Sequence, residues 1–165
     1  MEPRSTTASS TPYRSLVFEC YNVVPTTIRP QLVSIVDDDH SVRRALRRLI
    51  QYAGFTAEAF ASAEEFLGSA SLVRTACLVL DIHLNGEMSG FELQQRLTAD
   101  QVVIPIIFIT GNDDASTRQR AHTSGASAYL CKPFDDELLL DTIRGVIRGG
   151  SRQRTGFMPS TFPAG

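Results

Sequence analysis

Residues 32–53 read LVSIVDDDHSVRRALRRLIQYA, which is an apolar run, three aspartates and then a segment with helical periodicity. The run Leu32–Val36 has the length and composition of a buried strand. The apolar positions after it recur at helical spacing, and they are Val42, Ala45, Leu46, Leu49, Ile50 and Ala53. The opposite face of this predicted helix carries four arginines, Arg43, Arg44, Arg47 and Arg48. We expect Gly54 to end the helix.

The same unit of strand and helix recurs along the chain. Further strands are predicted at 55–60, 77–80, 102–109 and 128–131. Capping boxes, each a Ser with a Glu three residues later, predict helix starts at Ser62 and Ser89. Another helix is predicted between a cap at Asn112 and an end at Gly125, and a last one opens at Asp135. This last helix turns its apolar residues inward, namely Leu139, Leu140, Ile143 and Val146 or Ile147.

Five strands that alternate with five helices predict an α/β fold. Parallel neighbours need crossover helices, so the alternation favours a doubly wound parallel sheet with helices on both faces. In such folds the functional site lies beyond the carboxyl ends of the strands. The polar residues at those ends are Asp37, Asp38, Asp39, Asp81, Thr110 and Lys132. The sequence therefore predicts that these side chains converge.

The converging residues suit phosphoryl chemistry. Carboxylates that meet raise each other's pKa values unless a divalent cation holds them. An oxygen-only ligand set suits Mg²⁺, which keeps water and phosphoryl oxygens among its ligands. Asp81 can act as a nucleophile toward phosphorus, the Thr110 hydroxyl can bind a phosphoryl oxygen, and Lys132 can neutralise the added charge.

Length and charge exclude several classes of protein. The chain has 165 residues and a formal net charge of −2, from 16 Lys and Arg against 18 Asp and Glu. This length suits one domain, and this charge offers no basic field for a nucleic-acid backbone. No stretch approaches the roughly 18 apolar residues of a membrane span, and the start lacks the pattern of a signal peptide. We therefore expect a cytoplasmic protein that binds neither nucleic acid nor membrane.

Composition divides the chain into three parts. Residues 1–30 are rich in Ser, Thr and Pro and are expected to be a flexible leader. Residues 31–148 form the predicted domain, and residues 149–165 are expected to be a disordered tail or linker stub. The three cysteines, Cys20, Cys77 and Cys131, have no metal-ligand spacing and are expected to be free thiols in a reducing compartment.

Four motifs in this order resemble the receiver domains of two-component response regulators, particularly the nitrogen-fixation-regulator type. They are VSIVDDDHSVR at 33–43, LDIHLNGEMSGFEL at 80–93, ITG at 109–111 and GASAYLCKPF at 125–134. The resemblance covers residues 31–148. It implies a flavodoxin-like (CheY-like) fold, in which five βα units build a parallel sheet of order 2-1-3-4-5.

The resemblance also implies a role for each site residue. Asp81 would accept the phosphoryl group. Mg²⁺ would be bound by Asp38, Asp81 and the backbone carbonyl of His83, and Asp37 would hold a metal-bound water. The phosphoryl oxygens would be bound by Thr110, Gly111, Lys132 and the His83 backbone. Thr110 and Tyr129 would form a switch pair, and the Lys132–Pro133 peptide would be cis.

A receiver of this type implies particular partners. A sensor histidine kinase or phosphotransfer protein would donate the phosphoryl group. A downstream protein of unknown identity would bind the surface of the fourth helix, fifth strand and fifth helix, or that surface would form a homodimer. The chain would be a switch whose activity is limited to its own phosphorylation and dephosphorylation. Because about seventeen residues follow residue 148, we expect a stand-alone receiver; the alternative is the receiver part of a DNA-binding regulator.

The sequence departs from the family in the loop after Asp81. Family members carry Met-Pro or Leu-Pro there, whereas this chain carries Leu84-Asn85-Gly86 and one additional residue before Ser89. Two further positions, His83 and Asn112, flank the route of an attacking water in the family. The altered loop leaves one alternative function open, a receiver fold that binds partners without being phosphorylated, although the intact set of Asp81, Thr110 and Lys132 argues against it.

Simpler interpretations exist for several features. The three aspartates could only cap a helix. Asp37, Asp39 and Ser41 also imitate the Asp-x-Asp-x-Thr motif of haloacid-dehalogenase-like phosphatases, although that motif leaves Lys132 unexplained. The histidines, His40, His83 and His122, fit no metal-ligand spacing and are expected at the surface. The arginine face is expected to be solvated or to meet an acidic partner.

Overall fold

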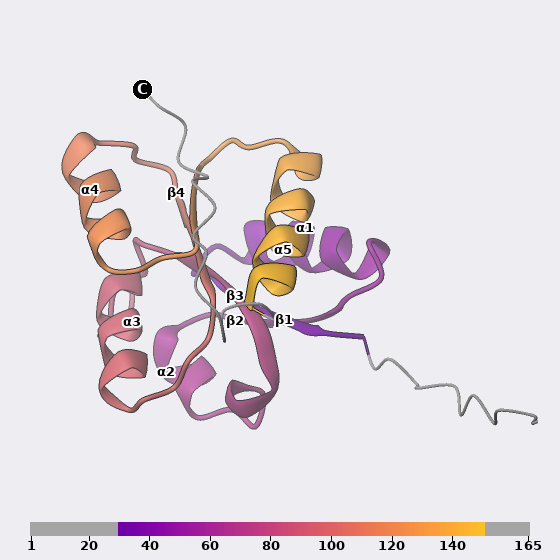
Figure 1. Cartoon of the computed structure of the whole chain (residues 1–165), viewed down its shortest axis with the longest axis horizontal. Helices are drawn as coiled ribbons and strands as arrows, with labels where there is room; N and C mark the ends of the chain where they lie inside the picture. The colour runs from indigo at the N-terminus through magenta and orange to yellow at the C-terminus, as the bar shows by residue number, and fades with distance from the viewer. Residues whose placement is uncertain (1–29, 151–165) are drawn as a thin grey trace, which may run out of the picture.

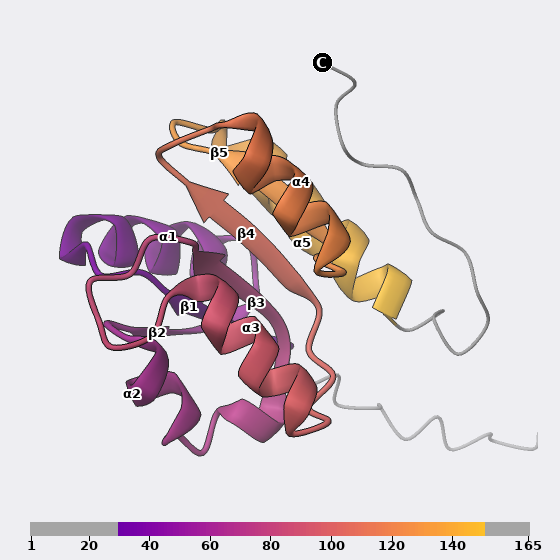
Figure 2. The ribbon, with the colours of Figure 1, turned by 90° about the vertical axis from the view of Figure 1, so that its left-hand side faces the viewer.

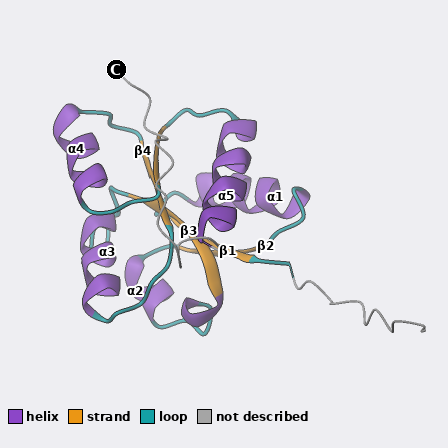
Figure 3. Ribbon diagram, in the orientation of Figure 1, coloured by secondary structure: helices purple, strands orange, loops and turns teal. Residues whose placement is uncertain are grey.

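Five parallel strands form one sheet in the computed structural model, which describes residues 30–150 (Figures 1 and 3). The strands are β1 (Leu32–Val36), β2 (Thr56–Phe60), β3 (Thr75–Asp81), β4 (Ile106–Thr110) and β5 (Ala128–Cys131). Their order in the sheet is β2-β1-β3-β4-β5, which confirms the predicted fold class and strand order. The predicted leader, and the tail from residue 151 onward, lie outside the described residues and stay predictions.

Helices cover both faces of the sheet (Figures 1 and 2). They are α1 (His40–Tyr52), α2 (Ala63–Leu67), α3 (Gly90–Ala99), α4 (Ala115–Thr123) and α5 (Asp136–Gly150), with a short 3₁₀ helix, η1 (Leu72–Arg74), before β3. Two hydrophobic clusters show that α1 and α5 pack on one face and α2, α3 and α4 on the other. Within residues 30–150, no helix is long and apolar enough to span a membrane.

The central strands are buried because both of their faces are covered. Every residue of β1 and β4 is buried. Along β1, Val33 and Ile35 belong to the cluster with α1 and α5, whereas Val36 belongs to the cluster on the other face. Such alternation between two apolar layers explains why these strands read as continuous apolar runs rather than as apolar and polar residues in turn.

Several predicted boundaries shift in the structure. β4 begins at Ile106 and not at residue 102, because Pro105 lacks an N–H and pairing starts with its carbonyl, which accepts from the Leu78 N–H. The cap of α4 is not Asn112, as predicted, but Asp114, whose Oδ1 accepts from the Thr117 N–H at 2.8 Å. Asn112 is instead held by the hydroxyl of the preceding strand end.

The two predicted capping boxes differ. The box at Ser89 is confirmed, since its hydroxyl accepts from Glu92 and its own N–H donates to the Glu92 carboxylate. At Ser62 only one of the two hydrogen bonds of a capping box forms. The hydroxyl accepts from the Glu65 N–H, but the Glu65 carboxylate accepts from the N–H of Ala61. Gly54 follows the end of α1 with φ of 91°, a conformation that a residue without Cβ adopts freely.

Gly90 lets the start of α3 approach the end of β3 more closely than any side chain would permit. A Cβ on Gly90 would lie 2.2 Å from the backbone oxygen of Asp81 and 2.9 Å from the Cα of Ile82. The Gly90 N–H donates to the Ile82 carbonyl at 3.1 Å, which fixes this approach. The close approach at Gly90 therefore helps to position the backbone of Asp81.

We expect Gly90→Ala to lower the free energy of unfolding by about 1–3 kcal/mol, because the new methyl group meets backbone that cannot move aside. Urea denaturation measures the change. Gly145→Ala is the matched control, since its Cβ meets nothing within 4 Å on α5 and should stabilise by up to about 1 kcal/mol. Equal stability of Gly90→Ala and the wild type would contradict this account of the close approach.

Candidate functional site

The predicted residues converge at the carboxyl ends of four neighbouring strands. Asp37 directly follows β1, Asp81 ends β3, Thr110 ends β4 and Lys132 directly follows β5. Asp37, Asp81 and Thr110 are buried, and the Lys132 N–H donates to the Thr110 carbonyl at 2.7 Å. A cleft of about 420 Å³ opens there, lined by Asp37, Asp38, Asp39, Val42, Asp81, His83, Gly111, Asn112 and Lys132.

Lys132 bridges two carboxylates inside this cleft. Its Nζ lies 2.7 Å from Asp37 Oδ2 and 2.6 Å from Asp81 Oδ2. The Asp37 side chain is 0% exposed, the Asp81 side chain 8% and the Lys132 side chain 23%, so the cation reaches the pair from the solvent side. The Lys132–Pro133 peptide is cis, as the family resemblance implies.

Burial and interactions with neighbouring groups shift the pKa values of Asp37 and Lys132 in opposite directions. Burial raises the pKa of Asp37 above its usual value, and hydrogen bonds from Lys132 and from the Asp39 N–H offset part of that rise. Burial also lowers the pKa of Lys132, but the hydrogen bonds to Asp37 and Asp81 outweigh it, so this pKa is raised. Lys132 is therefore a cation at neutral pH.

Three carboxylates in the cleft are arranged to share a metal ion. Asp37, Asp38 and Asp81 each offer an oxygen, and these atoms lie within 4.8 Å of one another. The donor set is oxygen only, which hard cations such as Mg²⁺ prefer. Asp81 Oδ1 also accepts from the His83 N–H at 2.8 Å. The predicted role of the His83 carbonyl stays a prediction.

The unusual loop after Asp81 contacts this carboxylate group. Asn85 Nδ2 donates a hydrogen bond to Asp38 Oδ2. The loop rests on the start of α2, where a Cβ on Gly86 would lie 3.3 Å from Glu64 Oε2. The pKa of Glu64 is lowered. The largest cause is a hydrogen bond with the Ser62 side chain, and a hydrogen bond from the Met88 N–H contributes less. The additional loop length thus places an amide over one predicted metal ligand.

The predicted switch residues are both tied to the loop after β4. The Thr110 hydroxyl accepts from the Asn112 N–H and donates to the Asn112 carbonyl, both at 3.1 Å. The hydroxyl of buried Tyr129 donates to Asp113 Oδ1 at 3.1 Å. Burial, followed by the Asp113 carboxylate, raises the pKa of Tyr129 to about 12. One short loop therefore binds both hydroxyls.

Several contacts at the site were not predicted from the sequence. Arg43 was assigned to a solvated face, yet its Nη1 donates to the Asp37 carbonyl at 2.7 Å. His83 is exposed as predicted, but its Nδ1 lies 3.2 Å from the Thr110 hydroxyl. Asp113 and Asn85 were not singled out for these contacts. The sequence features that could have indicated these two contacts are an acidic residue beside Asn112 and an asparagine in the inserted loop.

Two of the three cysteines lie in the described part of the chain, and both are free. Cys77 is buried, which raises the pKa of its thiol to about 12. Cys131 is half-buried, and Cys20 lies outside the described residues. The metal-ligand arrangement found within residues 30–150 contains carboxylates and no cysteine or histidine side chain.

Comparisons with known proteins agree with this geometry. Residues 33–144 match the response regulator receiver domain family. The chain is 45% identical over 112 residues to nodulation protein W of Bradyrhizobium diazoefficiens, which covers 68% of this chain and 49% of that protein. It is 37% identical over 127 residues to response regulator protein TodT of Pseudomonas putida, covering 77% and 56%. The chain thus spans about half the length of these curated relatives.

A solved structure shows the same fold. The chemotaxis protein CheY4 of Vibrio cholerae is 29% identical, with a TM-score of 0.65. The alignment covers 71% of this chain and 98% of that one.

We expect Lys132→Met to lower the free energy of unfolding by about 1–3 kcal/mol at pH 7, less than for a fully buried pair because Lys132 is partly exposed. The loss arises because Asp37 and Asp81 then repel each other without a cation. It should shrink as the pH falls, because Asp37, whose pKa is raised by burial, then takes up a proton. Urea denaturation as a function of pH measures the effect.

The free energy of unfolding of the wild-type protein should fall as the pH is raised far above neutral. Because the pKa of Lys132 is raised in the folded state, its contribution is present at neutral pH and is lost only as the pH rises through that raised value. Arg148→Met removes an exposed cation from α5 and serves as the control. A stability loss in Lys132→Met that does not change with pH would argue against the bridge.

Proposed function

The chain belongs to the response regulator receiver domain family, and we propose that it is a switch in which Asp81 accepts a phosphoryl group from a histidine kinase or a phosphotransfer protein. The observation that supports this proposal is the position of Asp81. It ends the central strand β3 at the floor of an open cleft, with Lys132 Nζ 2.6 Å from its Oδ2. A cytoplasmic location is part of the same proposal.

The proposed reaction transfers one phosphoryl group. A carboxylate oxygen of Asp81 forms a bond to phosphorus while the bond from phosphorus to the donor breaks. The bonding electron pair leaves with the donor, which is a histidine nitrogen of the kinase or the acetate oxygen of acetyl phosphate. Hydrolysis of the acyl phosphate by water restores the carboxylate and releases inorganic phosphate. These two steps are the only catalysis proposed for the chain itself.

The carboxylate group fits Mg²⁺. Asp38 and Asp81 would hold the ion with the His83 carbonyl, and Asp37 would hold a water on it, as the family resemblance implies. When bound, Mg²⁺ neutralises negative charge that develops on the phosphoryl oxygens. Lys132 adds a second positive charge to the same place, and its raised pKa keeps it protonated during transfer. The Lys132 ammonium must leave Asp81 Oδ2 or share it when this oxygen attacks.

Binding of the phosphoryl group would be coupled to the loop after β4. To donate to a phosphoryl oxygen, the Thr110 hydroxyl has to give up its hydrogen bond to the Asn112 carbonyl. Tyr129 would then leave Asp113 as that loop moves. Phosphorylation thereby favours a second arrangement of the loop and of the surface of α4, β5 and α5. That surface would bind the downstream partner or a second copy.

Two forms of output are compatible with this switch. The curated relatives are about twice the length of the matched region, which favours a receiver that controls a further domain, as in DNA-binding regulators. The stand-alone receiver expected from the sequence stays a prediction. Both forms share the chemistry at Asp81, so one experiment tests the proposal for either.

We expect a single phosphoryl adduct after incubation with acetyl phosphate and Mg²⁺, and none in Asp81→Asn, because the amide is not nucleophilic. Intact-mass spectrometry measures the adduct. Asp136→Asn is the matched control, since this carboxylate is exposed at the start of α5. An adduct of equal yield in Asp81→Asn would refute the assignment. No adduct in the wild type, with Mg²⁺ binding also lost, would favour a binding module that is not phosphorylated.

We expect Asn85→Ala to bind Mg²⁺ about threefold to tenfold more tightly, because the ion no longer competes with an amide for Asp38 Oδ2. Isothermal titration measures the dissociation constant without any need for phosphorylation. Asn112→Ala is the matched control, because Asn112 lines the same cleft and uses its backbone for its contacts. Unchanged or weaker binding in Asn85→Ala would show that the loop supports the site and does not obstruct it.

A further inference from the structure

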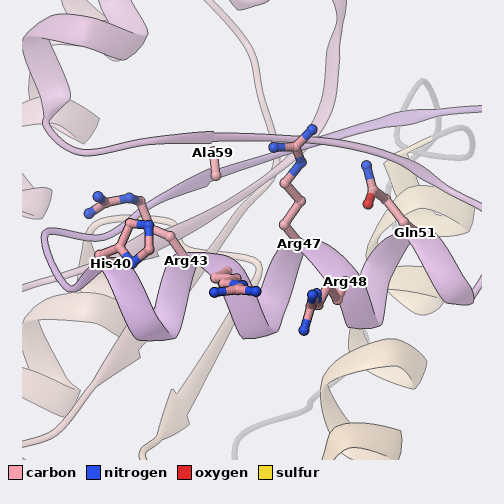
Figure 4. A pocket seen from close by; sticks show the side chains of 7 residues that line it. His40, Arg43, Arg47, Arg48, Gln51 and Ala59 are labelled. Atoms are coloured by element: carbon pink, nitrogen blue, oxygen red, sulfur yellow. The ribbon is translucent and has the colours of Figure 1, made fainter.

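A second groove lies between α1 and β2, beside the site for phosphoryl transfer. Its volume is about 460 Å³, and its lining residues are His40, Arg43, Arg44, Arg47, Arg48, Gln51 and Ala59. Except for Ala59, each of them has a partner three or four residues away along α1, so they form one continuous stripe over three turns. Figure 4 shows Arg47 and Gln51 rising from the helix on the side of the strand that carries Ala59. We call this stripe and strand the α1/β2 groove.

The positive charge of the α1/β2 groove is not compensated within the described part of the chain. No carboxylate of residues 30–150 forms an ion pair with Arg44, Arg47 or Arg48. The only acidic residue of β2, Glu58, is used elsewhere, since it accepts from Ser71 and from Arg74. A complementary ligand must therefore bring its own negative charge.

Ala59, which lines the groove, belongs to β2, an edge strand of the sheet formed by residues 30–150. Among residues 30–150, β2 pairs only with β1, through groups such as the Thr56 N–H, which donates to Gln31, and the Phe60 carbonyl, which accepts from Asp37. Because backbone groups alternate along a strand, the N–H and C=O of Ala57 and Ala59 face outward. Their small side chains lie on the α1 side of the sheet, where they leave room beside the arginines.

These observations select an extended ligand. We propose that the α1/β2 groove binds an acidic, extended segment of a partner protein, which adds to β2 as a further strand and places alternate carboxylates against the arginines of α1. An open strand edge offers main-chain hydrogen bonds only to an extended peptide. The arginines, from Arg43 to Arg48, supply forked donors for carboxylates along about 7.5 Å of helix, at 1.5 Å per residue. A single phosphate would use only part of this length.

The chain itself does not supply such a segment. Outside residues 30–150 the sequence carries two glutamates and no aspartate, against five arginines. The other free edge of the sheet, β5, has the sequence AYLC and no carboxylate, so a second copy paired edge to edge would bring no negative charge. Charge complementarity therefore favours a partner protein over any segment of these 165 residues.

The test uses the full chain and synthetic peptides. An eight-residue peptide of alternating Glu and Thr presents all its carboxylates on one face of a strand, whereas a peptide with two Glu and two Thr in turn has the same composition without this alternation. We expect the alternating peptide to bind more tightly. Its binding should also protect the amide protons of Ala57 and Ala59 from hydrogen exchange, as measured by NMR.

Two variants separate the groove from general charge effects. Arg47→Glu should weaken binding of the alternating peptide about fivefold, since an attraction becomes a repulsion. Arg148→Glu makes the same change in charge on exposed α5 and should have little effect. Arg43 is left unchanged because it also bonds the Asp37 carbonyl.

Four results would overturn the proposal. Equal affinity for the two peptides would indicate a surface that attracts any polyanion, and so would equal binding of inorganic polyphosphate. Binding without protection of Ala57 and Ala59 would exclude strand addition. No binding of either peptide would mean that the arginine stripe is only solvated. None of these results depends on whether Asp81 is phosphorylated.

Discussion

The contact of one ammonium group with two buried carboxylates is the constraint on which the site depends. Asp37 follows β1 and Asp81 ends the neighbouring strand β3, so the sheet itself brings their charges together. Without a cation these groups would resist burial, because a carboxylate in a dry environment is costly unless it is paired. Lys132 supplies that cation from β5, two strands away from β3. The charge balance of the cleft therefore depends on the strand order, which brings Lys132 to Asp37 and Asp81.

Much of this arrangement could be predicted because it follows from regular structure. The apolar runs and the helical stripe between Val42 and Ala53 indicate the elements, and their alternation implies parallel strands. Once strands are parallel, residues that follow them must meet at one edge, whatever the side-chain details. Asp37, Asp81, Thr110 and Lys132 converge for this reason alone. The order of the strands came from family resemblance and not from periodicity.

The contacts that escaped prediction lie in loops, where no period applies. Whether Asn85 reaches Asp38 depends on how the inserted loop rests on α2, and the local sequence does not encode this. Likewise Asn112 and Asp114 are equally good helix caps by residue type. In the structure the Asn112 N–H donates to the Thr110 hydroxyl two residues earlier, and the Asp114 side chain caps α4. In both cases the contacts of the folded loop, and not a repeating pattern, decide the outcome.

The bridge between the strands also has a chemical signature. Lys132 is the only lysine in the sequence, and every other cationic side chain that is always charged is an arginine. The chain therefore carries one side-chain amine, and it lies between two carboxylates. An amine attacks acylating reagents only after it loses its proton, and the two carboxylates oppose that loss. The rate at which this single amine is acylated thus reports directly on whether the bridge is closed or open.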